Sequence, residues 1–140
     1  MKNQLRRLLV TVGLSAVLGS SLLNAQTSGK IGVADVPFSF RIADRVLPPG
    51  NYTVSARSGG LMELWNKNTN QGMMFVAGAH ESGKSEPKLV FNRYGERYFL
   101  AQVWFGDEDS GRVLSRGHLE KEIAGVEGTP HGSLASIRIK

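Results

Sequence analysis

Apolar and polar side chains alternate with a period of two along most of the chain. Over residues 36–42 the even positions are apolar, and the odd positions are Pro37, Ser39 and Arg41. This pattern predicts a strand with one buried face. Pro37 cannot donate a ladder hydrogen bond, which favours a place at a sheet edge. Four further segments are candidate strands, namely residues 51–57, 61–66, 73–79 and 134–139.

Turn-forming residues separate the candidate strands. Leu-Pro-Pro-Gly at 47–50 and Ser-Gly-Gly at 58–60 combine a fixed φ with glycines that permit positive φ. Polar stretches at 66–72 and 80–87 are typical of loops. About seven short strands separated in this way predict an all-β domain, either a small antiparallel sandwich or a barrel.

Two of these strands have clearly assigned faces, and one segment departs from the β pattern. Tyr52, Val54 and Ala56 are expected to point inward from one strand, and Ala135, Ile137 and Ile139 from the last one.

The segment that departs from the β pattern is a short helix expected near residues 116–124, which Ser115 could cap. Its Glu120, Lys121 and Glu122 are expected to be exposed.

The clearest hairpin covers residues 88–105. A three-residue loop over 93–95 with Gly95 in a left-handed conformation places Leu89 and Phe91 on one apolar face. That face then continues through Phe99, Ala101, Val103 and Phe105. A two-residue loop would bring Arg and Glu onto it, so the sequence favours the longer loop. The opposite face then carries Tyr98, Leu100, Gln102 and Trp104.

The N-terminus has the layout of a secretory signal peptide. Basic residues among the first seven precede an apolar or small run over 8–23, and Ala25 is a small residue at the expected cut. Cleavage after Ala25 would leave a flexible lead-in over 26–32 and one β-rich domain over 33–140. An uncleaved anchor is disfavoured because Gly and Ser interrupt a run shorter than the ~20 residues that span a bilayer.

We therefore expect an exported protein, periplasmic or secreted, that meets the membrane only through its signal peptide before cleavage. Removing residues 1–25 takes away Lys2, Arg6 and Arg7, which lowers the formal net charge from +5 to +2. The remaining charges are interspersed and do not form the basic stripe of a nucleic-acid binder. With no cysteine, the chain has no disulfide framework and no thiolate metal site.

Residues 78–85 match the phosphate-binding pattern Gly-x4-Gly-Lys-Ser letter for letter. In a nucleotide site this loop opens a helix whose backbone amides cradle the phosphates. Here Pro87 and the β-rich stretch 89–91 follow at once, and the helix is missing from the pattern. We interpret the stretch as a glycine-rich connection and keep nucleotide binding as the weakest alternative function.

Other candidate chemistry is equally sparse. The three histidines, His80, His118 and His131, are far apart, whereas metal sites need converging ligands. The acidic triplet 107–109 lacks the length and spaced oxygens of a calcium loop. We therefore predict no catalytic residue, no metal ligand and no cofactor.

Four motifs connect the chain with other proteins: VPFSF at 36–40, LPPGNYTV at 47–54, KLVFNRYG at 88–95 and YFLAQVW at 98–104. Together they resemble a family of small exported bacterial proteins of unknown function, over roughly residues 33–124. The resemblance implies export and a β-rich fold. It implies no activity and no site residues.

These observations favour a non-catalytic binding or structural protein of the bacterial cell envelope. Its candidate partner face holds Tyr98, Gln102 and Trp104, because a mixed aromatic and polar surface can dock a protein or a glycan. Pairing at an edge strand is another expected mode. Coverage of the aromatic face by the rest of the fold is the structural alternative. A hydrolase of cell-surface polymers that uses Asp107 or Glu108 with a histidine is the alternative function.

Overall fold

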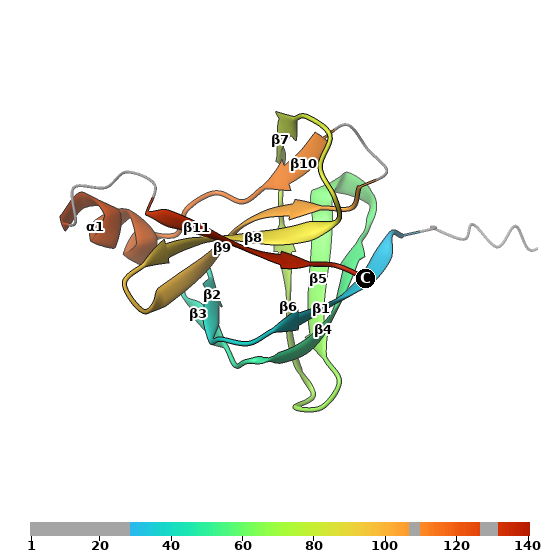
Figure 1. The fold of residues 1–140 in the computed structure, drawn as a ribbon, viewed down its shortest axis with the longest axis horizontal. Helices are drawn as coiled ribbons and strands as arrows, with labels where there is room; N and C mark the ends of the chain where they lie inside the picture. Colours follow the sequence, from blue (N-terminus) through green and yellow to red (C-terminus); the bar gives the residue numbers. More distant parts are fainter. Residues whose placement is uncertain (1–28, 107–109, 127–131) are drawn as a thin grey trace, which may run out of the picture.

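The chain folds into two β-sheets with one short helix (Figure 1). The computed structural model describes residues 29–106, 110–126 and 132–140. Its strands are β1 (Ile31–Val36), β2 (Phe40–Ile42), β3 (Arg45–Leu47), β4 (Gly50–Ala56), β5 (Leu61–Asn66), β6 (Gln71–Val76), β7 (Ala79–Ser82), β8 (Lys88–Tyr94), β9 (Arg97–Trp104), β10 (Ser110–Val113) and β11 (Ser133–Arg138). A 3-10 turn η1 (Ser58–Gly60) and the helix α1 (His118–Val126) complete the described elements. The predicted all-β class is confirmed.

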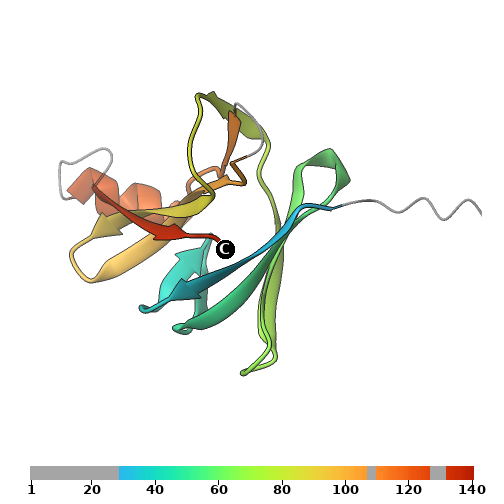
Figure 2. The same cartoon turned by 45° about the vertical axis from the view of Figure 1, so that its right-hand side comes forward.

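The first sheet has the strand order β1-β4-β5-β6, and the second has the order β11-β8-β9-β10-β7. A small hairpin of β2 and β3 joins the second sheet, where β2 runs parallel to β9. Figure 2 shows the first sheet, in blue to green, facing the second, in yellow to red. The buried core lies between the two sheets.

Aromatic rings hold the two sheets together. Phe40 of β2 makes edge contacts with Tyr52 of the first sheet and Phe91 of the second, both at a centroid distance of 5.3 Å. Phe38 stacks on Tyr98 with centroids 3.8 Å apart. Such pairs contribute about 0.5–1.5 kcal/mol each beyond the apolar area that they bury. The segment that leads from β1 into β2 therefore contributes aromatic side chains to the core between the two sheets.

The sheets also join along one side, where β1 meets the end of the chain. Val33 N donates to Lys140 O at 3.0 Å, and Lys140 N donates to Val33 O at 2.8 Å. Ala34 and Ile139 form an isolated bridge at the same place. This junction covers the outer edge of β1 with the residues that follow β11.

Most predicted strands are confirmed, with shifts at their ends. β4, β5 and β11 match the expected segments, and Tyr52 and Val54 are fully buried as expected. The single strand expected over 36–42 is wrong: β1 ends at Val36 and β2 begins at Phe40. Pro37 ends β1 because it cannot donate to the ladder. β1 begins inside the expected lead-in, and β7 replaces part of the polar loop expected over 80–87.

The hairpin of β8 and β9 corrects the predicted register. Tyr94 pairs with Arg97 across a two-residue loop, although Gly95 is left-handed as expected, with φ 59°. Further along, Phe91 pairs with Leu100 and Val90 pairs with Gln102, so Ala101 is an extra residue in β9. A bulge of this kind shifts the alternation by one position. It does so without the three-residue loop that the sequence favoured.

The bulge redistributes the side chains of β9 between the two faces. Leu100 and Val103 share the inter-sheet core with Leu89 and Phe91, whereas Phe99 lies on the opposite face. The expected grouping of Phe99 with Leu89 and Phe91 is therefore wrong. Ala101 accepts a hydrogen bond at its carbonyl from Leu114 N at 2.8 Å, which satisfies the bulged backbone.

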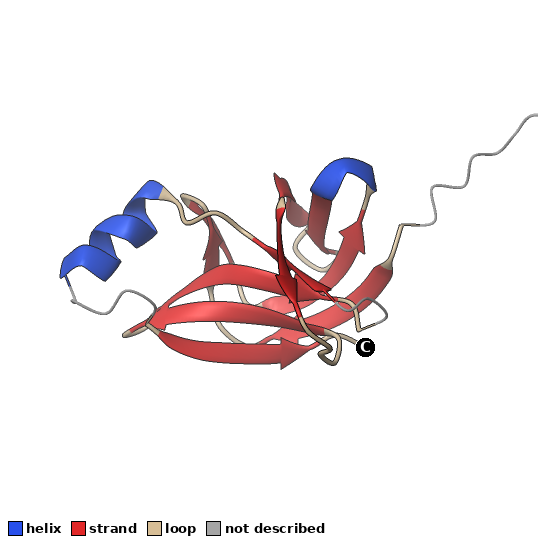
Figure 3. Cartoon of the chain, turned by 90° about the horizontal axis from the view of Figure 1, so that it is seen from above, coloured by secondary structure: helices blue, strands red, loops and turns tan. Residues whose placement is uncertain are grey.

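The helix α1 packs on this opposite face of the second sheet, at one end of the molecule (Figure 3). Ile123 and Ala124 of α1 form a small cluster with Tyr94 and Phe99 of the hairpin. Lys121 and Glu122 are exposed as expected, but Glu120 is only 4% exposed, so its predicted exposure is wrong. The reason is a polar network described below.

Gly50, at the start of β4, should tolerate no side chain. Its φ of +153° strains any other residue, and a Cβ would lie 2.3 Å from Nδ2 of the buried Asn66. Asn66 in turn accepts backbone hydrogen bonds from Asn68 and Thr69, which shape the turn between β5 and β6. Gly50→Ala is expected to lower the free energy of unfolding by about 2–3 kcal/mol in urea denaturation.

Gly78→Ala is the matched control. No atom lies within 4 Å of a Cβ at Gly78, so its unfolding free energy should change by less than about 0.5 kcal/mol. Equal losses in the two variants would contradict the steric explanation for Gly50.

Candidate functional site

The three residues of the predicted partner face do not lie together. Tyr98 points into the inter-sheet core, where it stacks on Phe38. Gln102 and Trp104 lie on the other face of the sheet, because the bulge at Ala101 intervenes. The continuous aromatic face expected from simple alternation is therefore wrong.

Gln102 and Trp104 do form a local polar and aromatic pair. Trp104 Nε1 donates to Gln102 Oε1 at 2.9 Å, and the Gln102 side-chain amide donates to Glu81 of β7. Trp104 is only 6% exposed, and a Cβ at Gly111 would lie 2.3 Å from its ring. The indole fills the space that this glycine leaves, which makes it a packing residue of the second sheet.

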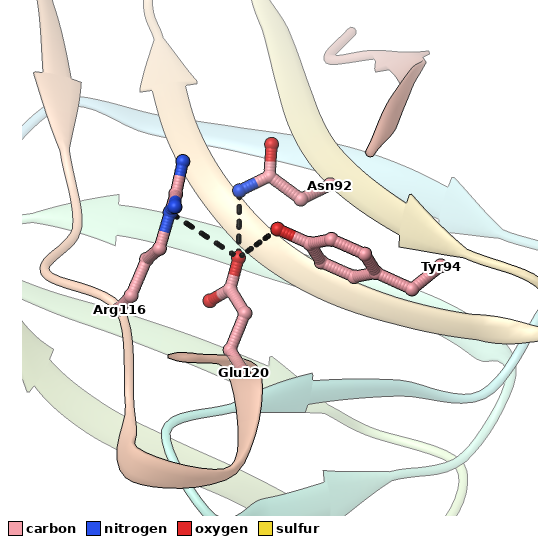
Figure 4. Close-up of polar contacts among 4 residues, drawn as sticks. All are labelled: Asn92, Tyr94, Arg116 and Glu120. Atoms are coloured by element: carbon pink, nitrogen blue, oxygen red, sulfur yellow. Dashed lines mark hydrogen bonds and ion pairs between the residues drawn. The ribbon is translucent and has the colours of Figure 1, made fainter. Parts of the chain in front are cut away.

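Four polar side chains converge beneath α1 (Figure 4). Asn92 Nδ2 donates to Glu120 Oε1 at 2.7 Å, and the Tyr94 hydroxyl donates to the same oxygen at 3.4 Å. Arg116 Nε lies 3.9 Å from it. A buried carboxylate is stable only when hydrogen bonds and opposite charge replace its water, as they do here.

The network around Glu120 contains the side-chain types of an acid–base centre, but a substrate could not reach its carboxylate. Glu120 is 4% exposed, and the nearby cavity between α1 and the hairpin loop is lined by Tyr94, Glu122 and Ile123 without Glu120. We therefore interpret the network as the attachment of α1 to the second sheet. Sequence patterns alone could not identify it, because its residues come from segments about 28 positions apart.

The phosphate-loop pattern is spread over unrelated local structure. Residues 79–82 form β7, Gly83 turns the chain with φ 141°, and the next element is the strand β8. No helix follows the lysine, so the described chain lacks the amide cradle that phosphate binding requires. A nucleotide site at residues 78–85 has no geometric support.

The remaining candidates are scattered or lie outside the described residues. His80 belongs to β7 and His118 is exposed at the start of α1, whereas His131 and the triplet 107–109, with Asp107 and Glu108, lie outside the described residues. Within the described ranges, no three His, Cys, Asp or Glu side chains are placed to hold a metal ion.

The outer face of the first sheet carries apolar side chains that no described element covers. We define the outer apolar face as Ile31, Val33, Trp65, Met74 and Val76. The strand register places these residues on one side, because Ile31, Ser55, Glu63 and Met74 lie in one row and Val33, Thr53, Trp65 and Gly72 lie in the next. Val76 is 66% and Met74 53% exposed, which is unusual for neighbouring large apolar side chains.

β6 is the edge strand of this sheet. Within the described ranges, no strand pairs with its free side, and residues 71–79 include no charged side chain and no proline. Three other edge strands carry protective features: β3 begins with Arg45 and precedes two prolines, β7 contains Glu81, and β1 meets residues 139–140. Natural proteins usually protect free edges with charges or proline, so an unprotected edge calls for a functional explanation.

The sequence carries a sign of this surface in the alternate positions of β5 and β6. Leu61 and Trp65 occupy outward positions of β5, and Met74 and Val76 occupy outward positions of β6. A strand that is apolar at both parities needs cover on both faces. The prediction assigned only the inward residues of these strands, so it did not identify the outer apolar face.

No protein-family model, no curated protein and no solved structure matches the chain. Among the described residues, no helix has the length and apolar character needed to cross a membrane. The function is therefore argued from the chain's own surface.

Glu120→Ala should loosen α1. The substitution leaves Asn92 Nδ2 and the Tyr94 hydroxyl without their shared buried acceptor. Leaving a buried donor such as Asn92 Nδ2 without this acceptor costs about 1–3 kcal/mol, so the free energy of unfolding is expected to fall by about 2 kcal/mol in urea denaturation. Amide hydrogen exchange should also become faster in α1.

Glu122→Ala, one position from the network and exposed, provides the control. It should change the unfolding free energy by less than about 0.5 kcal/mol. If Glu120→Ala behaves like this control, the carboxylate does not attach the helix.

Proposed function

We propose that the protein is an exported, non-catalytic binding module of the bacterial cell envelope that pairs the free edge of β6 with an extended segment of an envelope protein. The observation that carries this proposal is the uncharged edge of β6 beside the outer apolar face. Added strands gain affinity from main-chain hydrogen bonds and specificity from alternate side chains. Both kinds of contact are open at β6.

The geometry limits what a partner strand would touch. Neighbouring strands lie about 4.8 Å apart, so a strand added to β6 would pack its side chains against Met74 and Val76. Trp65 is one strand further in, and Ile31 is three strands from the edge. Full burial of one large apolar side chain gains about 1.5–3 kcal/mol, so these neighbours would contribute more than the distant ones.

An enzymatic role has less support. Its predicted acids, Asp107 and Glu108, lie outside the described residues, and the buried carboxylate of Glu120 belongs to the lining of neither the cavity beside α1 nor the cavity at Arg112. General acid–base catalysis needs a titratable group within reach of a substrate. Binding through β6 therefore explains more of the described surface than catalysis does.

Export is the second part of the proposal, and its support is the basic and then apolar N-terminus with Ala25 at the expected cut. The protein produced in a Gram-negative host should be recovered from the periplasm or medium with Gln26 as its first residue. N-terminal sequencing checks this. Recovery of the uncleaved chain in the membrane would favour an anchor.

Charges introduced beside the edge should abolish partner binding. A double variant, Met74→Lys with Val76→Lys, places two cations next to any added strand, and both positions are exposed enough to accept lysine. In a pull-down from envelope extract analysed by mass spectrometry, we expect a partner recovered by the unchanged protein to fall at least about tenfold.

Two control substitutions separate this effect from added charge. Val46→Lys and Leu134→Lys introduce the same charge at residues 50% and 68% exposed on β3 and β11. This control should retain the partner. Loss of the partner in both proteins, or in neither, would rule out β6 as the binding edge.

A further inference from the structure

A cavity of about 520 Å³ opens between the two sheets, away from the free side of β6. Lys30 before β1, Arg57 after β4 and Leu61 at the start of β5 line it from the first sheet. Phe105 after β9 and Arg112 of β10 line it from the second. Cavities of this size accommodate small ligands in many proteins.

The charged residues that line the cavity are all basic. Lys30, Arg57 and Arg112 belong to its lining, and no carboxylate is among the described lining residues. Arg57 Nη2 makes an ion pair at 3.0 Å with Glu63, which lies outside the cavity. This pair compensates the charge of Arg57, so the cationic character of the cavity does not rest on Arg57.

Arg112 is the best-placed of these cations. Leu114, two residues later, packs against the inter-sheet core, and strand alternation gives Arg112 the same inward direction. Its Nη1 would lie 3.7 Å from a Cβ at Gly60, a position whose φ of +78° favours glycine. The guanidinium therefore lies beside the backbone of η1.

Within the described ranges, no carboxylate makes an ion pair with Arg112. The residue is partly buried, and removing a charge from water is costly unless an opposite charge compensates. A guanidinium presents paired N–H donors that match carboxylate and phosphate oxygens. Leu61 and Phe105 are the large apolar residues that line the cavity together with Ile31 of the outer apolar face.

We propose that this cavity binds a small organic anion, in which a carboxylate or phosphate group contacts Arg112 and an attached apolar moiety contacts Leu61 and Phe105. This site is separate from the β6 edge and does not depend on the function proposed above.

Isothermal titration calorimetry with simple amphiphiles tests the proposal on the mature protein. Octyl phosphate and octanoate, below their micelle concentrations, represent the two anionic groups, and octyl glucoside is the neutral probe. Inorganic phosphate tests the anion without an apolar part. We expect at least one octyl anion to bind about tenfold more tightly than both the neutral probe and inorganic phosphate.

Substitutions at Arg112 identify the ligand. Arg112→Gln should weaken binding of the octyl anion at least about tenfold, whereas Arg112→Lys should retain part of the affinity. Arg138→Gln removes an exposed arginine outside the cavity and should leave the affinity unchanged. Equal affinity of Arg112→Gln and the unchanged protein would overturn the proposal.

A measurement on the unchanged protein covers the case in which the Arg112 variants fail to fold. In two-dimensional NMR spectra, octyl phosphate or octanoate should shift the amides of Arg57, Leu61, Phe105 and Arg112. Shifts confined to other regions would overturn the proposal. Binding that appears only after the acidic residues 107–109 are replaced by their amides would overturn it too, because the chain's own carboxylates would then be the ligand.

Discussion

The packing of the second sheet depends on one extra residue in β9. Ala101 shifts the alternation, so Leu100 and Val103 both reach the inter-sheet core while Phe99 and Trp104 both lie on the other face. In a regular strand Leu100 and Val103 would point in opposite directions. One of them would then leave the core, and either the aromatic contacts between the sheets or the support for α1 would be lost. The bulge therefore allows one strand to serve two apolar surfaces.

The two sheets consequently differ in how completely they are covered. The second sheet buries one face against the first sheet and part of its other face beneath α1. The carboxylate of Glu120 attaches this helix to the sheet. The first sheet has no such cover among the described residues, although Trp65, Met74 and Val76 project from its outer face. Exposed apolar area of this kind is costly in water. The asymmetry therefore directs the search for a partner to the first sheet and to its edge at β6.

Local patterns predicted the fold well where each strand needs cover on one face only. The segments at β4 and β11 followed simple alternation, and their inward residues were correctly assigned. The predictions failed where the deciding contact is distant in sequence. The bulge at Ala101 depends on the strands that pair with β9. The burial of Glu120 depends on its hydrogen bond with Asn92. Residues 36–42 form two strands because the chain passes there from the first sheet to the second. The candidate site was missed for a related reason, because Trp65 and Met74 form a surface only after β5 and β6 pair.

Gly60 lies between the residue that follows β6 and Arg112 of β10. Ala77, directly after β6, donates its backbone N–H to Gly60 O at 2.9 Å. On its other side, Gly60 borders the guanidinium of Arg112. The same positive-φ residue therefore holds the end of β6, in the first sheet, and lies beside Arg112 of β10, in the second sheet. A Cβ at Gly60 would lie 2.9 Å from Ala77 O, so the close approach of these two backbone segments depends on glycine.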